Sequence, residues 1–128
     1  MTECILDASA LLALINLEKG KDIVEKLLPV SVMSTVNAAE VVGEVCLKFS
    51  IDKKDCETMV STLVNKIVDF DLSQAAIAGE LKRTTSKYGL SLGDRACIAL
   101  GLSLNLPIYT SDTIWSKLDV PIKITLIR

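Results

Sequence analysis

Short apolar runs alternate along this chain with longer stretches whose apolar residues recur at helical spacing. Cys4-Ile5-Leu6 stops at Asp7, and residues 9–17 then carry apolar side chains on a helical period. Four further segments look like strands: 30–34, 67–70, 107–110 and 122–127. Strands alternating with helices predict right-handed βαβ units. The expected fold class is therefore α/β, with a mostly parallel central sheet flanked by helices on both faces.

Capping and helix-breaking residues indicate where the predicted helices begin and end. Gly20 separates the first helix from a second one, which Pro29 ends. Asn37 is expected to cap the next helix, because Glu40 follows it at the spacing of a capping box. Gly89 and Asn105 are expected to end two later helices. The helices predicted after residue 50 cover 52–64, 73–88, 96–104 (opened by residues 91–94) and 113–118.

Length and composition favour one domain spanning residues 1–128. Half of the residues are hydrophobic, but no unbroken apolar run reaches the roughly 20 residues needed to span a bilayer. The N-terminus carries Glu3 and Asp7 where a signal peptide would have basic residues, so a cytoplasmic protein is expected. The four cysteines form no C-x-x-C pair and lie among apolar neighbours, which indicates buried free thiols.

The chain contains no histidine, and this absence excludes several kinds of catalytic site. Ser-His and Cys-His nucleophiles, imidazole bases and histidine-containing zinc sites are all ruled out. Chemistry must come from carboxylates, hydroxyls or amines. The formal net charge of −2 also lacks the basic excess of a protein that holds nucleic acid by bulk electrostatics. A phosphate ligand would need local help, which bound metal cations can provide.

Four acidic residues occupy equivalent places in the predicted fold. Asp7 and Asp112 each follow a predicted strand, whereas Glu40 and Asp94 each fall in the first turn of a predicted helix. Ligands of open α/β sheets bind beyond the carboxyl ends of the strands, so all four acids are expected to face one cleft. Clustered carboxylates repel one another unless a cation is present, and Mg²⁺ or Mn²⁺ prefers oxygen ligands. The pattern predicts a site for Mg²⁺ or Mn²⁺.

Each of these acids also has a purely structural explanation. An acidic residue in a first helical turn is commonly a cap or a dipole-compensating residue, and taken alone Glu40 and Asp94 favour that role. Turn formation explains either Asp7 or Asp112 about as well as metal ligation does. Only the joint placement of the four residues shifts the balance towards a functional site.

Hydroxyl and charged side chains near the acids are further candidates. Ser9 and Thr110 lie two residues from Asp7 and Asp112, where a hydroxyl could orient a carboxylate or a water. Capping by Ser9 and strand preference of Thr110 explain the two residues equally well. Glu44, one turn further along the helix of the second acid, is interpreted as a solvated helix residue.

A basic group formed by Lys82, Arg83 and Lys87 lies near the end of one predicted helix. These side chains could contact an RNA backbone. Cations also favour a helix C-terminus, and the group is not interleaved with aromatic residues for base stacking. The sequence alone therefore favours an ordinary charged face.

The four acidic segments resemble the motifs of a known family. Residues 89–100, GLSLGDRACIAL, look like the third-acid motif of the PIN-domain ribonucleases over its full length. Residues 6–11 resemble the first-acid motif, residues 37–40 the second, and residues 110–112 the terminal Thr-x-Asp. Their order and spacing agree with the VapC-type toxins of type II toxin–antitoxin pairs.

The resemblance implies a metal-dependent endoribonuclease in which Asp7, Glu40, Asp94 and Asp112 ligate Mg²⁺ or Mn²⁺, supported by Ser9 and Thr110. It also implies a homodimer, structured RNA substrates such as tRNA or rRNA, and a small cognate antitoxin whose C-terminal segment occupies the active-site groove. One departure is Ser111, where many relatives carry Arg, so that a possible phosphate contact is missing.

Two other functions stay open. One is a PIN nuclease that acts in RNA maturation or decay outside a toxin pair. The other is a non-catalytic phospho-acceptor or metal-sensing α/β module with Asp7 as the modified group. The sequence argues against the second, because Ser9 stands where a phosphatase-like motif has its second Asp. A receiver module would also usually open with an adjacent acidic pair.

Overall fold

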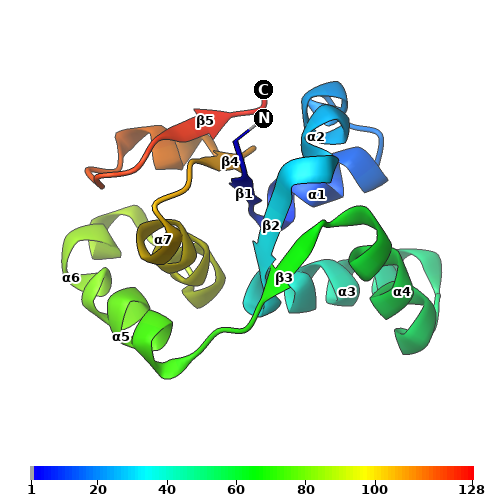
Figure 1. Cartoon of the computed structure of the whole chain (residues 1–128), viewed down its shortest axis with the longest axis horizontal. Helices are drawn as coiled ribbons and strands as arrows, with labels where there is room; N and C mark the ends of the chain where they lie inside the picture. The colour runs from blue at the N-terminus through cyan, green and yellow to red at the C-terminus, as the bar shows by residue number, and fades with distance from the viewer. Residues whose placement is uncertain (1) are drawn as a thin grey trace.

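A computed structural model describes residues 2–128 and contains one five-stranded sheet in the order β3-β2-β1-β4-β5 (Figure 1). Every neighbouring pair of strands is parallel. The strands are β1 (Cys4–Leu6), β2 (Ser31–Ser34), β3 (Lys66–Val68), β4 (Ile108–Thr110) and β5 (Ile124–Leu126). The predicted α/β class is confirmed, and the sheet is parallel throughout.

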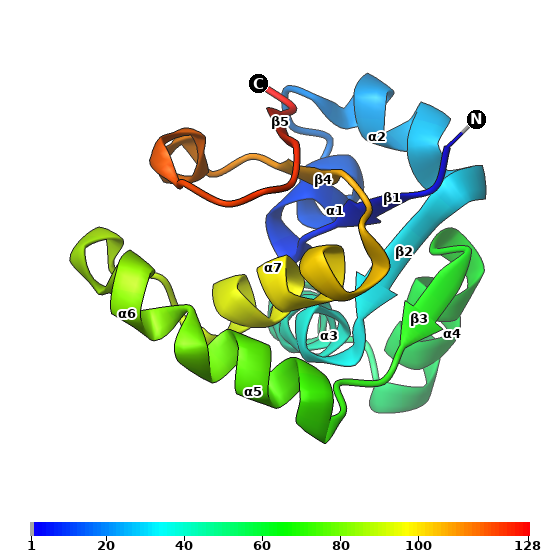
Figure 2. The ribbon, with the colours of Figure 1, turned by 60° about the vertical axis from the view of Figure 1, so that its left-hand side comes forward.

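Helices cover both faces of the sheet, as Figures 1 and 2 show. One face carries α1 (Ala8–Ile15), α2 (Lys21–Leu27), α3 (Thr35–Phe49) and α4 (Lys53–Leu63). The other carries α5 (Leu72–Glu80), α6 (Lys82–Thr85) and α7 (Leu92–Leu104). The described part of the chain, residues 2–128, also contains three 3-10 helices: η1 (Leu28–Val30), η2 (Ser86–Tyr88) and η3 (Thr113–Lys117). None of the helices found in residues 2–128 is long and apolar enough to cross a bilayer.

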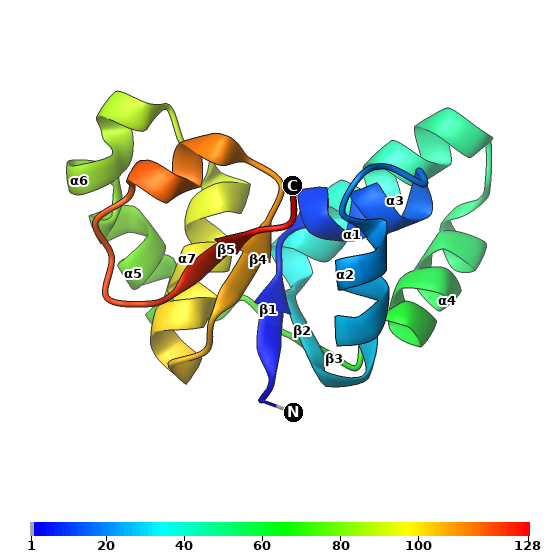
Figure 3. The same ribbon diagram turned by 90° about the horizontal axis from the view of Figure 1, so that it is seen from above.

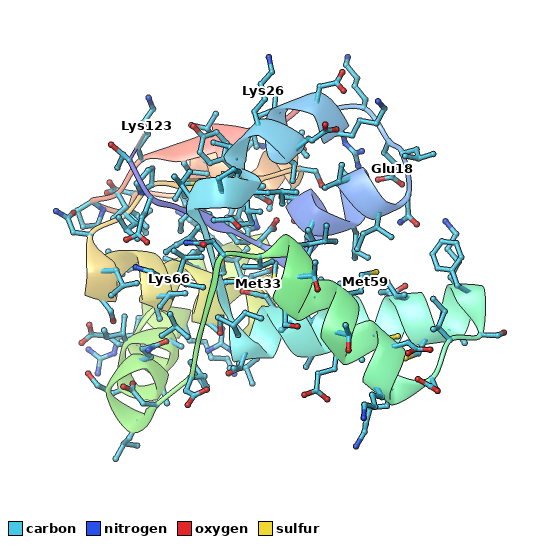
Figure 4. The ribbon with its side chains drawn as sticks, turned by 45° about the vertical axis from the view of Figure 1, so that its right-hand side comes forward. Glu18, Lys26, Met33, Met59, Lys66 and Lys123 are labelled. Atoms are coloured by element: carbon cyan, nitrogen blue, oxygen red, sulfur yellow. The ribbon has the colours of Figure 1, made fainter. Side chains whose placement is uncertain are left out.

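The strands contribute side chains to two hydrophobic cores, because successive side chains of a strand point to opposite faces of the sheet. Leu6 of β1 and Met33 of β2 pack into the first core with α1–α4, where Met59 of α4 joins them (Figure 4). Ile5 and the fully buried face of α7 belong to the second core, together with Trp115 of η3. The four cysteines are free, and all but the half-buried Cys46 are buried, as the sequence predicted.

The carboxyl ends of the central strands and the N-termini of α1, α3 and α7 meet at one end of the molecule. Strands β1, β2 and β4 run the same way, so that Leu6, Ser34 and Thr110 end at one edge. Helix α7 runs back along the sheet, and its first turn lies at this same end (Figure 3). This edge therefore collects the segments that contain the candidate acids.

Two predicted helix boundaries are wrong. Ser34 caps α3, because its Oγ accepts a hydrogen bond from Val36 N at 3.1 Å, so that Asn37 lies inside the helix. The helix expected over residues 73–88 is broken at Leu81 into α5, α6 and η2. The hydroxyls of Thr84 and Thr85 both donate to the Leu81 carbonyl, at 3.4 and 2.7 Å, and such local bonds compete with a regular helix.

The C-terminal elements are shorter than predicted. The short helix expected over residues 113–118 is the 3-10 helix η3 over residues 113–117, and the last strand is limited to Ile124–Leu126. The expected helix ends at Gly89 and Asn105 are confirmed, with both residues in the left-handed region at φ 67° and 53°.

Candidate active site

Asp7 is a buried carboxylate at the end of β1, and its relative exposure is 5%. It caps α1, because Oδ1 accepts a hydrogen bond from Ala10 N at 2.9 Å. Thr110 Oγ1 donates to Oδ2 at 2.6 Å, and Ser9 Oγ lies 2.8 and 2.9 Å from the two carboxylate oxygens. Three donors from two chain segments therefore fix the orientation of Asp7.

The hydroxyls of Ser9 and Thr110 also join the ends of β1 and β4. Ser111 N donates to Ser9 Oγ at 3.0 Å, and Asp112 N donates to Thr110 Oγ1 at 3.1 Å. Ser9 is not the helix cap that the structural explanation required, because Asp7 takes that role. Both hydroxyls instead position the first acid.

Burial raises the pKa of the Asp7 carboxyl from 3.8 to about 6. Hydrogen bonds from Thr110, Ala10 and Ser9 lower the pKa and oppose this effect, whereas the nearby charge of Asp94 raises it slightly. A cation bound beside Asp7 would favour the ionised form and remove much of this cost. The fold therefore holds a carboxylate in a place that suits it only when a positive charge is near.

Asp94 stands in the first turn of α7 and is half-buried. Its Oδ2 accepts a hydrogen bond from Ser91 N at 3.0 Å, and Ser91 Oγ accepts one from Asp94 N at 3.1 Å. This reciprocal pair is a capping box, which the sequence suggested for this acid. The capping bonds hold the Asp94 carboxylate at the edge of the pocket, so a capping role and a role in the pocket are compatible.

Glu40 is held by a residue whose place in the site the sequence did not reveal. Asn37 is 1% exposed, and its Nδ2 donates to Glu40 Oε1 at 2.8 Å and to the Gly93 carbonyl at 3.0 Å. This amide bridges α3 and α7. The capping role considered for Glu40 is wrong, because its partner is a side chain one helical turn back and the cap is Ser34.

Gly93 provides the space that the Glu40 carboxylate occupies. A Cβ at this position would lie 2.5–2.6 Å from the three atoms of that carboxylate group, closer than real contacts allow. Gly93 forms part of the third-acid motif, but nothing in the local sequence indicates that α3 approaches it. The roles of Asn37 and Gly93 become visible only through contacts between residues far apart in the chain, which local sequence patterns do not indicate.

The four predicted acids line one pocket of about 260 Å³ at the carboxyl edge of the sheet. Asp112 is exposed there and caps η3 by accepting a hydrogen bond from Ile114 N at 3.0 Å. Glu44, interpreted from the sequence as a solvated helix residue, also lines the pocket. The lining consists of Asp7, Ala8, Ser9, Leu12, Asn37, Glu40, Glu44, Asp94 and Asp112. No lysine or arginine is among these residues.

Cys97 lies one turn after Asp94 in α7, and three of these acids affect the pKa of its thiol. Burial raises the pKa of its thiol well above the ordinary value, and the charges of Asp7, Asp94 and Glu40 raise it further. These three carboxylates therefore lie near enough to act on the thiol, in agreement with their shared place in the pocket lining. Negative charge is therefore concentrated at this edge without a protein cation among the pocket residues.

The donor atoms of the pocket suit a hard divalent cation. They are carboxylate oxygens, hydroxyls and the Asn37 Oδ1, a buried acceptor that has no hydrogen-bond partner among residues 2–128. Over the same range, no three acidic or cysteine side chains lie close enough together to form a finished metal site. Mg²⁺ usually keeps several of its waters, so ligands spread around a pocket are compatible with it.

Asn37→Ala should lower the free energy of unfolding by about 1–3 kcal/mol, because it leaves the Gly93 carbonyl and Glu40 Oε1 without their donor. Urea unfolding of the purified variant measures this. Asn65→Ala is the control, since Asn65 is exposed and bonds through its backbone N. Equal stability of wild type and Asn37→Ala would contradict the bridging role.

Comparison with solved structures shows the same fold in several toxin complexes. The DNA-bound VapBC of Salmonella typhimurium matches with a TM-score of 0.74 and 15% identity, over 100% of both chains. A toxin–antitoxin complex from Klebsiella pneumoniae matches with a TM-score of 0.76 and 18% identity, over 98% of each chain. VapC20 of Mycobacterium tuberculosis, described as a sarcin-ricin loop cleaving toxin, matches with a TM-score of 0.72 and 17% identity, over 94% and 99%.

Sequence comparison gives the family directly. No curated protein sequence matches the chain significantly. The model of the PIN domain matches residues 4–121, a range that includes every acid of the pocket. Because that match covers nearly the whole chain, this protein belongs to the PIN-domain family.

Proposed function

We propose that this chain is a divalent-metal-dependent endoribonuclease and the toxin of a type II toxin–antitoxin pair. The observation that carries the proposal is that Asp7, Glu40, Asp94 and Asp112, from four separate segments, line one pocket in a PIN domain. The fold match to a VapBC complex and to VapC20, which is described as a sarcin-ricin loop cleaving toxin, supports the toxin assignment.

In this proposal the four acids hold Mg²⁺ or Mn²⁺ directly or through water, with Asn37 Oδ1 as a further oxygen donor. A bound ion would polarise the scissile phosphate and activate a water for in-line attack. Asp7 is oriented for ligation by Ser9 and Thr110, which leave its carboxylate little freedom to turn. Asn37 holds Glu40 towards α7 in the same way.

The partners follow from the same assignment. Several matched structures are toxin–antitoxin complexes, so we propose a small antitoxin that covers the acid pocket, and a homodimer of the chain itself. The proposed substrate is structured RNA, either tRNA or rRNA. A PIN nuclease of RNA maturation would lack the antitoxin, so a small protein that is encoded beside this gene and inhibits cleavage would distinguish the two roles.

The test is cleavage of total cellular RNA by the purified chain with Mn²⁺, followed by sequencing of the new RNA ends. We expect discrete cleavage sites that disappear with a chelator. Asp94→Asn should reduce cleavage by at least about a hundredfold, since it removes one charge from the metal pocket. Asp55→Asn is the matched control, because Asp55 occupies the first turn of α4 outside the pocket. Cleavage that persists without metal, or in full with Asp94→Asn, would refute the proposal.

A further inference from the structure

A second pocket, of about 330 Å³, lies between η2 and the connection from η3 to β5. One wall is the continuous segment from Arg83 to Tyr88, and Asp119 stands on the other. The first segment runs into the helix that begins with Asp94 in its first turn, and η3 begins directly after Asp112. Figure 3 places α6 and the orange segment after β4 at the same end of the sheet as the carboxyl ends of the strands. The two pockets are thus joined by short pieces of chain.

Positive charge dominates the first wall of this pocket. Arg83 and Lys87 line this wall and Lys82 directly precedes it in the chain, and none of the three forms an ion pair among residues 2–128. Asp119 is the one acid of the lining. The acid pocket repels phosphate and the whole chain carries a net charge of −2, so an RNA strand needs cations close to the site. This segment supplies them.

The pocket also contains the aromatic residue that the sequence pattern did not connect with the basic group. Tyr88 is half-buried in the lining, and Lys87 Nζ lies 5.1 Å from the centroid of its ring. Thr84 and Ser86 are exposed hydroxyl-bearing residues of the same lining. A cation, hydroxyls and an aromatic ring in one hollow match the groups that bind a phosphate and stack a neighbouring base.

We propose that this pocket binds the backbone of the RNA substrate outside the acid pocket, with Arg83 and Lys87 on phosphates and Tyr88 against a base. The inference rests on the proposed ribonuclease function and adds a positioning site to it. Arg83 and Lys87 act on affinity and do not touch the reacting phosphate, so that their loss raises KM and leaves kcat nearly unchanged. The break of the helix at Leu81 has a use in this arrangement, because the segment from Lys82 to Tyr88 forms α6 and η2 and does not continue the regular turns of α5.

The experiment measures the binding of a fluorescein-labelled RNA hairpin of about 20 nucleotides by fluorescence anisotropy, without divalent metal, over a series of salt concentrations. Arg83→Gln/Lys87→Gln should weaken binding about tenfold and reduce the slope of log K against log salt by about 1 to 1.5. Tyr88→Leu should weaken binding severalfold without changing that slope, because stacking releases no counterions.

Lys53→Gln/Lys54→Gln is the matched control, since it removes the same charge from α4 on the opposite face of the sheet. The control should change binding less than twofold. Equal effects of the two double variants would overturn the inference, and so would an unchanged salt slope in Arg83→Gln/Lys87→Gln. If the wild type cleaves RNA and the pocket variants cleave it equally well, this inference alone is refuted and the proposed function stands. Pocket-dependent RNA binding without any metal-dependent cleavage would remove the proposed function and keep the binding site.

Discussion

Asp7→Asn should abolish RNA cleavage and, in metal-free protein at pH 8, raise the free energy of unfolding by about 1–2 kcal/mol. The wild-type carboxylate must be ionised at this pH although it is 5% exposed and shares its pocket with other acids. Asn removes the charge and keeps an oxygen for the Ala10 N–H, while the two hydroxyls can rotate to accept from its amide. The full pKa shift of Asp7 is equivalent to roughly 3 kcal/mol. The expected gain in the free energy of unfolding is smaller, because the amide of Asn replaces the hydrogen bonds of the carboxylate imperfectly.

The pH dependence has a definite sign. The folded pKa of Asp7 is raised from 3.8 to about 6, so folding takes up a proton in the interval between these values. The contribution of this group to stability is therefore largest in acid, falls as pH rises from about 4 to 6, and is constant above that. The advantage of Asp7→Asn over wild type should shrink in step as the pH is lowered through this window.

Urea unfolding in a chelator at pH 8 and at pH 4.5 measures both effects. The control is Asp71→Asn: Asp71 caps α5 through an equivalent 2.9 Å bond from Gln74 N, but it is exposed. It should show no gain at pH 8. Added Mn²⁺ should raise the melting temperature of wild type and leave that of Asp7→Asn unchanged. An Asp7→Asn variant less stable than wild type at pH 8 without metal would contradict this account of the buried charge.

The strand-end acids could be predicted because their positions follow from a general property of parallel sheets. Once alternating strands and helices are recognised, the carboxyl ends of β1 and β4 must meet at one edge, and Asp7 and Asp112 with them. The sequence left the role of Thr110 open, and the structure shows that its hydroxyl donates to Asp7. What the pattern could not give was the depth of Asp7, since burial depends on how the helices close over that edge.

The residues that connect α3 with α7 could not be predicted from local sequence. Ser34 and Asn37 are both good caps three positions apart, and choosing between them depends on where β2 ends. The contact that gives Asn37 its role is with Gly93, 56 residues further on. The break at Leu81 was missed for a different reason. The hydroxyls of Thr84 and Thr85 donate hydrogen bonds to the Leu81 carbonyl, and the spacing of apolar residues gives no indication of such bonds.

Gly93→Ala should separate activity from stability more cleanly than any change to an acid. The new Cβ would lie 2.5 Å from Glu40 Oε2, so the carboxylate must leave the position in which Asn37 holds it. The backbone of Gly93 is helical and not left-handed, and alanine is favoured over glycine in a helix by up to about 1 kcal/mol. We expect a melting temperature within a few degrees of wild type and Mn²⁺-dependent cleavage reduced about 10–100-fold.

Gly43→Ala provides the comparison, because Gly43 lies on α3 one turn from Glu40 and has nothing within 4 Å of the point that a Cβ would occupy. It should keep full activity. Glu40→Asp in the Gly93→Ala background shortens the displaced side chain by one methylene and relieves the overlap. If the loss in Gly93→Ala comes from this contact, the effects of the two substitutions on cleavage should be less than additive, whereas unrelated sites would add. Full cleavage by Gly93→Ala would mean that the position of the Glu40 carboxylate does not matter to the reaction, and the second acid would then have to be removed from the proposed metal site.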